Sequence, residues 1–245
     1  MKTFLLTTLT LAATLSSARA ELLTVQNASF ETLFLADNTF NVASPGPAGW
    51  SAYGTINHNN RSIGAVNPTG SLLYPGGAPE GRNVGVVFLL DNASNQSQFA
   101  GIESGLVQTL SATLQTNTHY TLTVEVGNMA NDPATTNNAF VFTGFPGYRV
   151  DLLAGGQVIA SDNNSLLPSE GTFLTSQFSL SIGASHVLAG QALGIRLVNL
   201  NAGPGIEVNF DHVRLDATAI PEPATFASLF GAATLAMAIF RRRRA

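Results

Sequence analysis

Two carboxylates, Glu31 and Asp211, form the strongest candidate for a chemical site in this sequence. They lie near opposite ends of the central region, and the first and last strands of a β-sandwich can lie side by side. Two unpaired carboxylates at close range repel each other, whereas a calcium ion bound by their oxygens at about 2.3–2.6 Å removes that repulsion. The pair therefore predicts a structural calcium site. Surface acids that cap turns are the alternative.

A second group of side chains has the chemistry of a sugar-binding surface. An aromatic ring can stack on a pyranose face, and amide or guanidinium groups can bind its hydroxyls. These residue types are supplied by Trp50, Tyr53, Tyr74, Arg82 and Asn83. They predict a glycan-binding surface, with the alternative that the sole tryptophan fills the core of the domain.

The sequence contains little that predicts catalysis. It has no cysteine and no Gly-x-Ser-x-Gly motif, and its Gly-Gly pairs lack the lysine and helix of a phosphate-binding loop. The carboxylates of Glu103, Glu125 and Glu207 could in principle form a glycosidase pair, but their separation in space is invisible in the sequence. The histidines are scattered, with no metal-ligand spacing: His58, His119, His186 and His212. We therefore predict a protein that is not an enzyme.

The elements that must position these residues are short β-strands. Runs of β-branched and aromatic residues recur between Gly, Asn and Pro, and residues 120–126 alternate between apolar and polar. Two glycines within 154–157 predict a tight hairpin, and residues 128–147 predict an exposed loop. Strands are expected at 22–25, 50–53, 83–90, 105–110, 120–126, 148–153, 157–160, 172–181, 192–199 and 207–215. Because successive strand residues alternate in direction, His212 should face away from Asp211.

The fold class that follows is all-β, a single jelly-roll β-sandwich over residues 21–217. Its charge excludes one class of partner. Residues 21–220 contain five arginines and 14 acidic residues, a net charge of −9. Nucleic-acid binding needs a basic surface, so we predict no nucleic-acid partner.

Residues 1–20 predict a secretory signal peptide. Lys2 precedes an apolar stretch that ends at Ala18-Arg19-Ala20, with small residues at the cleavage site. We therefore expect export through the Sec machinery. Since no cysteine is present, the exported domain is stabilised by its core or a bound ion rather than by disulfides.

Residues 218–245 predict a membrane-anchoring signal. Pro221-Glu222-Pro223 precedes an uncharged apolar run over 224–240, long enough at about 1.5 Å per residue to reach roughly 25 Å as a helix. Four arginines follow and should stay on the cytoplasmic side: Arg241, Arg242, Arg243 and Arg244. The sequence thus predicts a single transmembrane helix with the domain outside.

This C-terminal arrangement resembles the PEP-CTERM sorting signal of exopolysaccharide-producing Gram-negative bacteria. The resemblance rests on the Pro-Glu-Pro motif, the apolar run and the terminal arginines in that order. It implies that an exosortase, a membrane-embedded cysteine protease, cuts near Glu222. The helix would then anchor the protein to the inner membrane only before processing.

The central region resembles galactose-binding-like jelly rolls, the fold of many carbohydrate-binding modules. The resemblance implies a structural calcium ion between Glu31 and Asp211. The chain departs from the family pattern in residues 32–48 and 128–147. The motifs that carry it are Asn27-Ala28-Ser29-Phe30-Glu31, Gly49-Trp50, Pro79-Glu80-Gly81-Arg82-Asn83, Leu106-Val107-Gln108-Thr109-Leu110, Tyr120-Thr-Leu-Thr-Val124 and Phe210-Asp211-His212-Val213-Arg214-Leu215.

These patterns together predict an exported, exosortase-sorted protein of the cell surface or extracellular matrix. It would be non-catalytic and would contact exopolysaccharide through the sandwich. The alternatives are an extracellular polysaccharide hydrolase or lyase, and a structural coat protein that binds no specific glycan.

Overall fold

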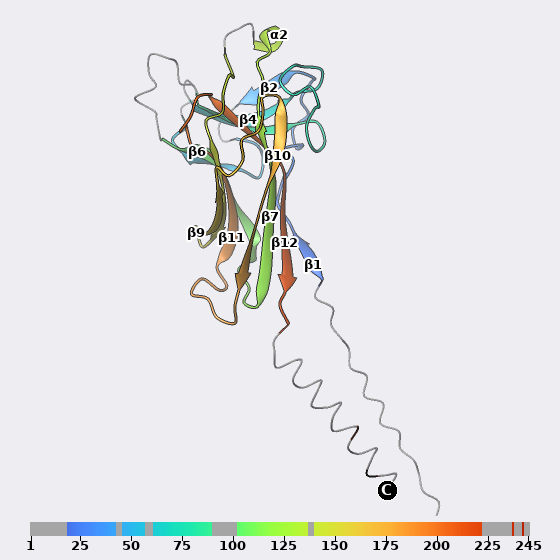
Figure 1. The fold of residues 1–245 in the computed structure, drawn as a ribbon, viewed down its shortest axis with the longest axis vertical. Helices are drawn as coiled ribbons and strands as arrows, with labels where there is room; N and C mark the ends of the chain where they lie inside the picture. The colour runs from blue at the N-terminus through green and yellow to red at the C-terminus, as the bar shows by residue number, and fades with distance from the viewer. Residues whose placement is uncertain are drawn as a thin grey trace, which may run out of the picture.

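A computed structural model describes residues 19–42, 46–56, 61–89, 102–136 and 140–221, together with the single positions 237 and 242. The described chain forms two antiparallel β-sheets that pack face to face, with a short helix at one end (Figure 1). The predicted all-β sandwich is therefore confirmed.

The larger sheet has seven strands in the order β10-β7-β12-β5-β4-β2, and β1 also pairs with β12. Its strands are β1 (Ala20–Leu23), β2 (Thr39–Val42), β4 (Arg61–Asn67), β5 (Val84–Leu89), β7 (Thr118–Asn128), β10 (Thr172–Ile182) and β12 (Glu207–Ala219). The smaller sheet has the order β3-β6-β11-β8-β9. Its strands are β3 (Ser51–Gly54), β6 (Ser104–Thr113), β8 (Tyr148–Ala154), β9 (Gln157–Asn163) and β11 (Ala192–Asn199). The helix is α2 (Pro133–Thr136).

The main core lies between the two sheets. The alternation predicted for residues 120–126 is present in β7, where Tyr120, Leu122 and Val124 are buried and the residues between them are partly exposed. Val150 and Leu152 of β8 meet this face from the smaller sheet. Each fully buried side chain of this kind contributes about 1.5–3 kcal/mol to stability.

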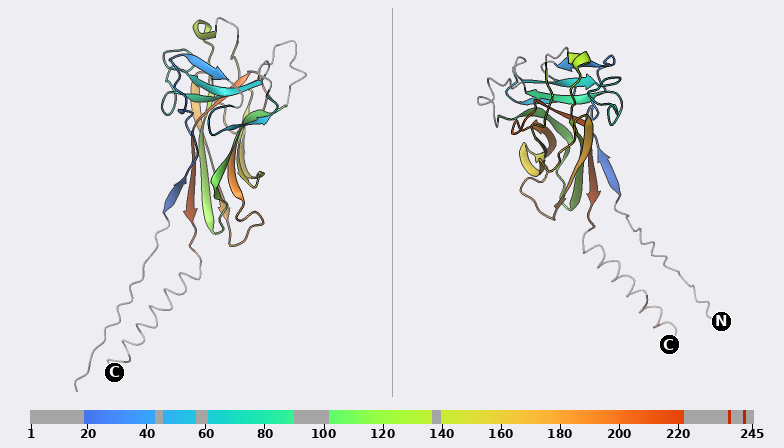
Figure 2. Two further views of the ribbon diagram at one scale, coloured as in Figure 1. Left: turned by 180° about the vertical axis from the view of Figure 1, so that it is seen from behind. Right: turned by 45° about the horizontal axis from the view of Figure 1, so that its top comes forward.

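A bulge bends β12 and changes its neighbours. The register with β7 shifts between Asp211 and Arg214, and His212 has a φ of +47°. On one side of the bulge residues 207–210 pair with β5, and on the other side residues 215–218 pair with β1. Figure 2 shows β2 and β4 lying across the upper end of the long strands.

A second apolar cluster covers the outer face of the larger sheet at this upper end. Val84 and Val86 of β5 contribute to it from the sheet, and Tyr74, Met129 and Phe142 contribute from the loops above. Both faces of the sheet are therefore buried here, and a loop-covered layer is formed outside the sandwich.

Most of the predicted elements are found, and two strands were missed. Each of the ten predicted strands overlaps a strand of the structure, and Gly155 and Gly156 form the predicted hairpin with φ values of +56° and +79°. The missed strands are β2 and β4. The expectation of a merely exposed loop over residues 128–147 was wrong, because Met129, Phe142 and Phe145 in this segment are buried.

The predictions for the two ends of the chain concern residues that are mostly outside the described ranges. Residues 1–18 and most of 222–245 lie outside the described residues, so the signal peptide, the 224–240 helix and the sorting signal stay predictions. Pro221 and Arg242 are described, and both are exposed. Within the described ranges we find no helix that is long and apolar enough to cross a membrane.

Candidate active site

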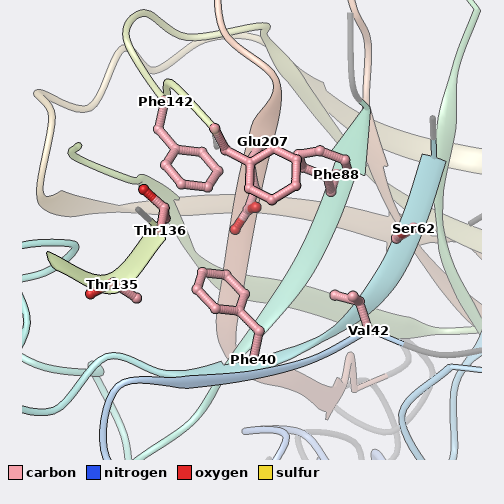
Figure 3. Close-up of a pocket in the computed structure, with 9 residues that line it drawn as sticks. Phe40, Val42, Ser62, Phe88, Thr135, Thr136, Phe142 and Glu207 are labelled. Atoms are coloured by element: carbon pink, nitrogen blue, oxygen red, sulfur yellow. The ribbon is translucent and has the colours of Figure 1, made fainter. Parts of the chain in front are cut away.

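The loop-covered layer contains a cavity of about 290 Å³ above the end of the larger sheet (Figure 3). Four phenylalanines give it a largely apolar wall, and Glu207 is the one ionisable side chain among the described residues that line it. The described residues that line it are Phe40, Val42, Ser62, Phe88, Thr135, Thr136, Phe140, Phe142 and Glu207.

The floor of this cavity is set by strand register. Glu207 of β12 pairs with Phe88 of β5, and Phe88 pairs with Ser62 of β4. Residues paired across a sheet project on the same side, so these three side chains form a row beneath the cavity. Asn209 is the next β12 residue on this face, because side chains alternate along a strand.

The opposite wall comes from α2 and the loop that follows it. Asp132 precedes the helix, and its carboxylate accepts hydrogen bonds from the backbone N–H groups of Leu72 and Ala134 at 2.9 and 3.0 Å. The Thr135 hydroxyl also lies 2.7 Å from this carboxylate. These bonds, led by that of Thr135, hold the pKa of Asp132 below its usual range. Asp132 thus fixes the threonines that face the cavity.

The aromatic wall is a contiguous set of rings. The ring centroids of Phe88 and Phe140 lie 5.3 Å apart in an edge-to-face arrangement, and those of Phe140 and Phe142 lie 6.4 Å apart. Figure 3 shows Phe40 and Phe142 on either side of the Glu207 carboxyl group. The negative faces of such rings attract a cation, so this wall suits a flat apolar molecule that becomes positively charged.

Glu207 is the chemically distinctive residue of the site. It is only 4% exposed, and burial raises its pKa to about 8. A hydrogen bond of 2.8 Å from Asn209 Nδ2 opposes this shift but does not cancel it. The carboxyl group therefore keeps its proton at neutral pH, as a general acid must.

The predicted pair of Glu31 and Asp211 is brought to one loop. Both oxygens of Asp211 accept backbone hydrogen bonds, from Glu80 at 2.9 Å and from His212 at 2.7 Å. Glu31 Oε1 accepts bonds from the N–H groups of Arg82 and Asn83, at 2.7 and 2.6 Å. The loop 80–83 therefore lies against both carboxylates.

Two further acidic residues, Glu31 and Glu80, lie near Asp211. Its side chain is fully buried, and burial, with a smaller contribution from the charges of Glu80 and Glu31, raises its pKa to about 8. The expectation for His212 was wrong: because of the bulge its Nε2 lies 3.7 Å from Glu80 Oε2, on the same side as these acids. In the parts of the chain that the structure covers, no three His, Cys, Asp or Glu side chains form a metal-binding group.

The five residues predicted for glycan binding do not form one surface. Trp50, Tyr74 and Asn83 are buried, and Trp50 stacks on Phe30 and donates its indole N–H to Asn27 O at 3.1 Å. Tyr53 lies on the smaller sheet, with the Arg196 guanidinium 4.3 Å from its ring centre. Arg82 is exposed and pairs with Asp37 at 2.6 Å.

Two features of the site were not predicted from the sequence. Glu207 was considered only as half of a glycosidase pair, although the alternation of Glu207, Asn209 and Asp211 with apolar residues places all three on one face of a strand. The phenylalanines come from three separate segments, and their meeting depends on the register of the missed strands β2 and β4.

Comparison with known proteins gives a family match over most of the chain. The family model described as HpiC1 cyclase matches residues 21–216. No curated protein matches the chain.

Solved structures of cyclases from Fischerella are similar over the same region. The Stig cyclase Fisc from Fischerella sp. TAU, in complex with (3Z)-3-(1-methyl-2-pyrrolidinylidene)-3H-indole, is 35% identical, with a TM-score of 0.73 over 83% of this chain and 100% of that chain. A cyclase from Fischerella sp. TAU in complex with 4-(1H-indol-3-yl)butan-2-one is 35% identical, with a TM-score of 0.72 over 82% and 100%. An apo cyclase from Fischerella sp. is 33% identical, with a TM-score of 0.70 over 83% and 98%.

These matches correct the functional predictions. The predicted non-catalytic protein that contacts exopolysaccharide was wrong, because the matched family and structures are cyclases, which are enzymes. The glycan-binding role and the membrane-anchored surface location are corrected as well, because the matched proteins are cyclases and the described residues include no helix that could span a membrane. From residue 21 to residue 216, this chain belongs to the HpiC1-like cyclase family.

Proposed function

We propose that this protein catalyses ring closure of an indole-containing substrate by acid catalysis in the phenylalanine-lined cavity, with Glu207 as the proton donor. One observation carries the proposal: a buried carboxyl group, protonated at neutral pH, lies among aromatic rings. The related Fischerella cyclases are described in complex with indole compounds, which fit a cavity of this size and polarity.

The reaction is an isomerisation that needs only proton transfer. Glu207 gives its proton to a basic nitrogen or a double bond of the substrate, and a cation forms. A carbon–carbon bond then forms between the electron-poor carbon and a neighbouring π bond, closing the ring. The Glu207 carboxylate takes up the proton that the ring-closed cation loses, so the acid is regenerated.

The aromatic wall supports the charged stage of this reaction. Water would capture a carbocation, and the apolar lining limits its access. Phe88, Phe140 and Phe142 present faces and edges toward the same space. A cation over an aromatic face is stabilised by about 0.5–2 kcal/mol per ring.

The cavity should bind the indole ketone that a related cyclase binds. We expect isothermal titration with 4-(1H-indol-3-yl)butan-2-one to give saturable binding at one site. Phe140 is 40% exposed, so Phe140→Ala should leave the fold intact and weaken binding about tenfold, which corresponds to about 1.4 kcal/mol. Phe34→Ala, which truncates a ring that is 77% exposed outside the cavity, is the matched control. Equal affinities of the two variants would contradict this assignment of the pocket.

We also propose that calcium binds beside Asp211. The buried carboxyl group of Asp211 lies close to Glu31 and Glu80, and such oxygen donors are those calcium prefers. The ion would lock loop 80–83 onto β12, four residues along the strand from Glu207. Its role would be structural, since the ring closure requires no metal.

Calcium should therefore stabilise the protein against heat. We expect an excess of calcium over chelator to raise Tm by about 5 °C or more, because a ligand at 100 times its Kd contributes about 2.7 kcal/mol. Asp211→Asn should abolish the calcium-dependent shift, and magnesium should not reproduce it in the wild type. A Tm that is the same in calcium and in chelator would contradict the site.

A further inference from the structure

We propose that Asn209 and Tyr74 are positioning residues that keep the catalytic proton of Glu207 on Oε2, the carboxyl oxygen that Asn209 does not bond. The inference rests on the proposed function, because it concerns the same acid. Neither residue lines the cavity, so both act through Glu207 rather than on the substrate.

Three hydrogen bonds fix the side-chain amide of Asn209. Its Nδ2 donates to Glu207 Oε1 at 2.8 Å and to the backbone oxygen of Gly85 at 3.2 Å. Its Oδ1 accepts a bond of 2.7 Å from the hydroxyl of Tyr74. Both amide hydrogens and the amide oxygen therefore have partners, and the group is fully buried.

These partners exclude the flipped amide. If the amide turned over, its oxygen would face the Gly85 carbonyl oxygen, and two acceptors would oppose each other in a buried site. The Tyr74 hydroxyl, which can donate, completes the correct orientation by bonding Oδ1. Gly85 and Tyr74 thus hold the Asn209 amide so that its Nδ2 donor, rather than its oxygen, faces Glu207.

The orientation decides where the Glu207 proton resides. The carbonyl oxygen of a carboxylic acid accepts a hydrogen bond more strongly than its hydroxyl oxygen does, so the N–H bond to Oε1 favours Oε1 as the carbonyl oxygen. The proton is then favoured on Oε2. Figure 3 shows the carboxyl group directed into the cavity, where a substrate can take this proton.

The sheet is built to admit the Tyr74 hydroxyl. Tyr74 is 1% exposed, and its ring lies 4.3 Å from that of Phe173. The hydroxyl passes over Gly127 of β7, the register partner of Asn209, where a Cβ atom would lie 2.5 Å from it. A phenylalanine would fill the same apolar space without burying a hydroxyl group. The bond to Asn209 offsets the cost of burying the Tyr74 hydroxyl.

The test is Tyr74→Phe, which removes one hydroxyl and keeps the ring. We expect kcat for ring closure to fall about tenfold with KM nearly unchanged, because the substrate contacts remain while the proton is no longer held on one oxygen. In infrared spectra the C=O band of protonated Glu207, identified by its absence in Glu207→Gln, should move to higher frequency as its hydrogen bond weakens. This band reports on the acid without any substrate.

Tyr120→Phe is the matched control. Tyr120 is equally buried, and its hydroxyl accepts a bond from Gln115 N at 2.8 Å, remote from the cavity lining. We expect this variant to keep the wild-type kcat and band position. If Tyr74→Phe matches Tyr120→Phe in both measurements, the positioning role is overturned.

A second variant reverses the polarity at the same place. Asn209→Asp replaces the N–H donor with an acceptor, which should draw the proton to Oε1 and lower kcat more than Tyr74→Phe does. Wild-type kcat in this variant would also overturn the inference. Failure of the proposed function gives a different pattern, namely that Glu207→Gln itself keeps turnover.

Discussion

Glu207→Gln is expected to abolish ring closure while making the folded protein more stable above neutral pH. Glutamine has the shape of the protonated acid and keeps an oxygen for the bond from Asn209, but it cannot donate the catalytic proton. General acid catalysis typically contributes about 10²–10⁴-fold in rate. We therefore expect kcat to fall by at least 100-fold, with the affinity for 4-(1H-indol-3-yl)butan-2-one retained.

The stability gain follows from the direction of the pKa shift. The pKa of Glu207 is about 8 in the folded protein and about 4.3 in an unfolded chain. Between these values the unfolded chain releases the proton and the folded protein keeps it, so the free energy of unfolding falls as pH rises. The glutamine variant has no such loss. At pH 9 it should be more stable than the wild type by several kcal/mol, and near pH 4 the two should be equal.

Turnover is measured with an indole that carries an unsaturated side chain, and ring closure is detected as a product of unchanged mass. Stability is measured by urea unfolding at pH 4 and at pH 9. Asp216→Asn is the matched control, because it removes a half-buried carboxylate from the same strand outside the cavity. It should keep turnover and show no comparable gain at pH 9. Turnover by Glu207→Gln within tenfold of the wild type would exclude Glu207 as the acid.

Among these substitutions, Asp151→Ala should lower the free energy of unfolding the most, although Asp151 is remote from the cavity. Asp151 is fully buried on β8 and accepts bonds from Arg149 Nε at 3.0 Å, Arg196 Nε at 2.7 Å and Ser161 Oγ at 2.7 Å. Removing one partner of a buried ion pair costs about 3–5 kcal/mol, although Arg149 keeps its ion pair with Glu103. The arginine side chains are 15–18% exposed, so we expect a loss near the lower value.

Urea unfolding at pH 7 measures this effect, and Asp37→Ala provides the contrast. Asp37 pairs with Arg82, but the two side chains are 60% and 47% exposed. Such a surface pair contributes at most about 1 kcal/mol. Equal losses in the two variants would contradict the role assigned to the buried network. The folded Asp151→Ala protein should still bind the indole ketone, because Asp151 lies on the other sheet.

The prediction of the sandwich succeeded where local pattern and burial agree. In β7 the apolar residues alternate and face the core, and the Gly155-Gly156 turn requires the backbone conformation that glycine adopts most easily. β2 and β4 gave no such signal: β2 is mostly exposed, and β4 (Arg61–Asn67) is buried on both faces and contains Arg61, Ser62 and Gly64. A strand covered on both sides loses the alternation that identifies strands.

The candidate site was harder to predict than the fold. Glu31 and Asp211 do lie close together, against loop 80–83, and the calcium site that they predict stays a prediction. His212 was placed on the wrong face, because a bulge cannot be recognised in a sequence of alternating residues. Tyr74 was expected to meet a ligand, yet it is buried and bonds Asn209, since loop 68–83 folds back over the sheet.

By itself, the sequence determined the all-β class, the acidic charge of the domain and the approach of its two ends. These properties follow from local periodicity and composition, which act over a few residues. Only the tertiary structure decided that Glu207 is an acid among phenylalanines. The reason is physical: its pKa depends on removal from water, and the loops that exclude water, together with the strands that bring Phe40, Phe88 and Phe142 together, come from distant parts of the chain.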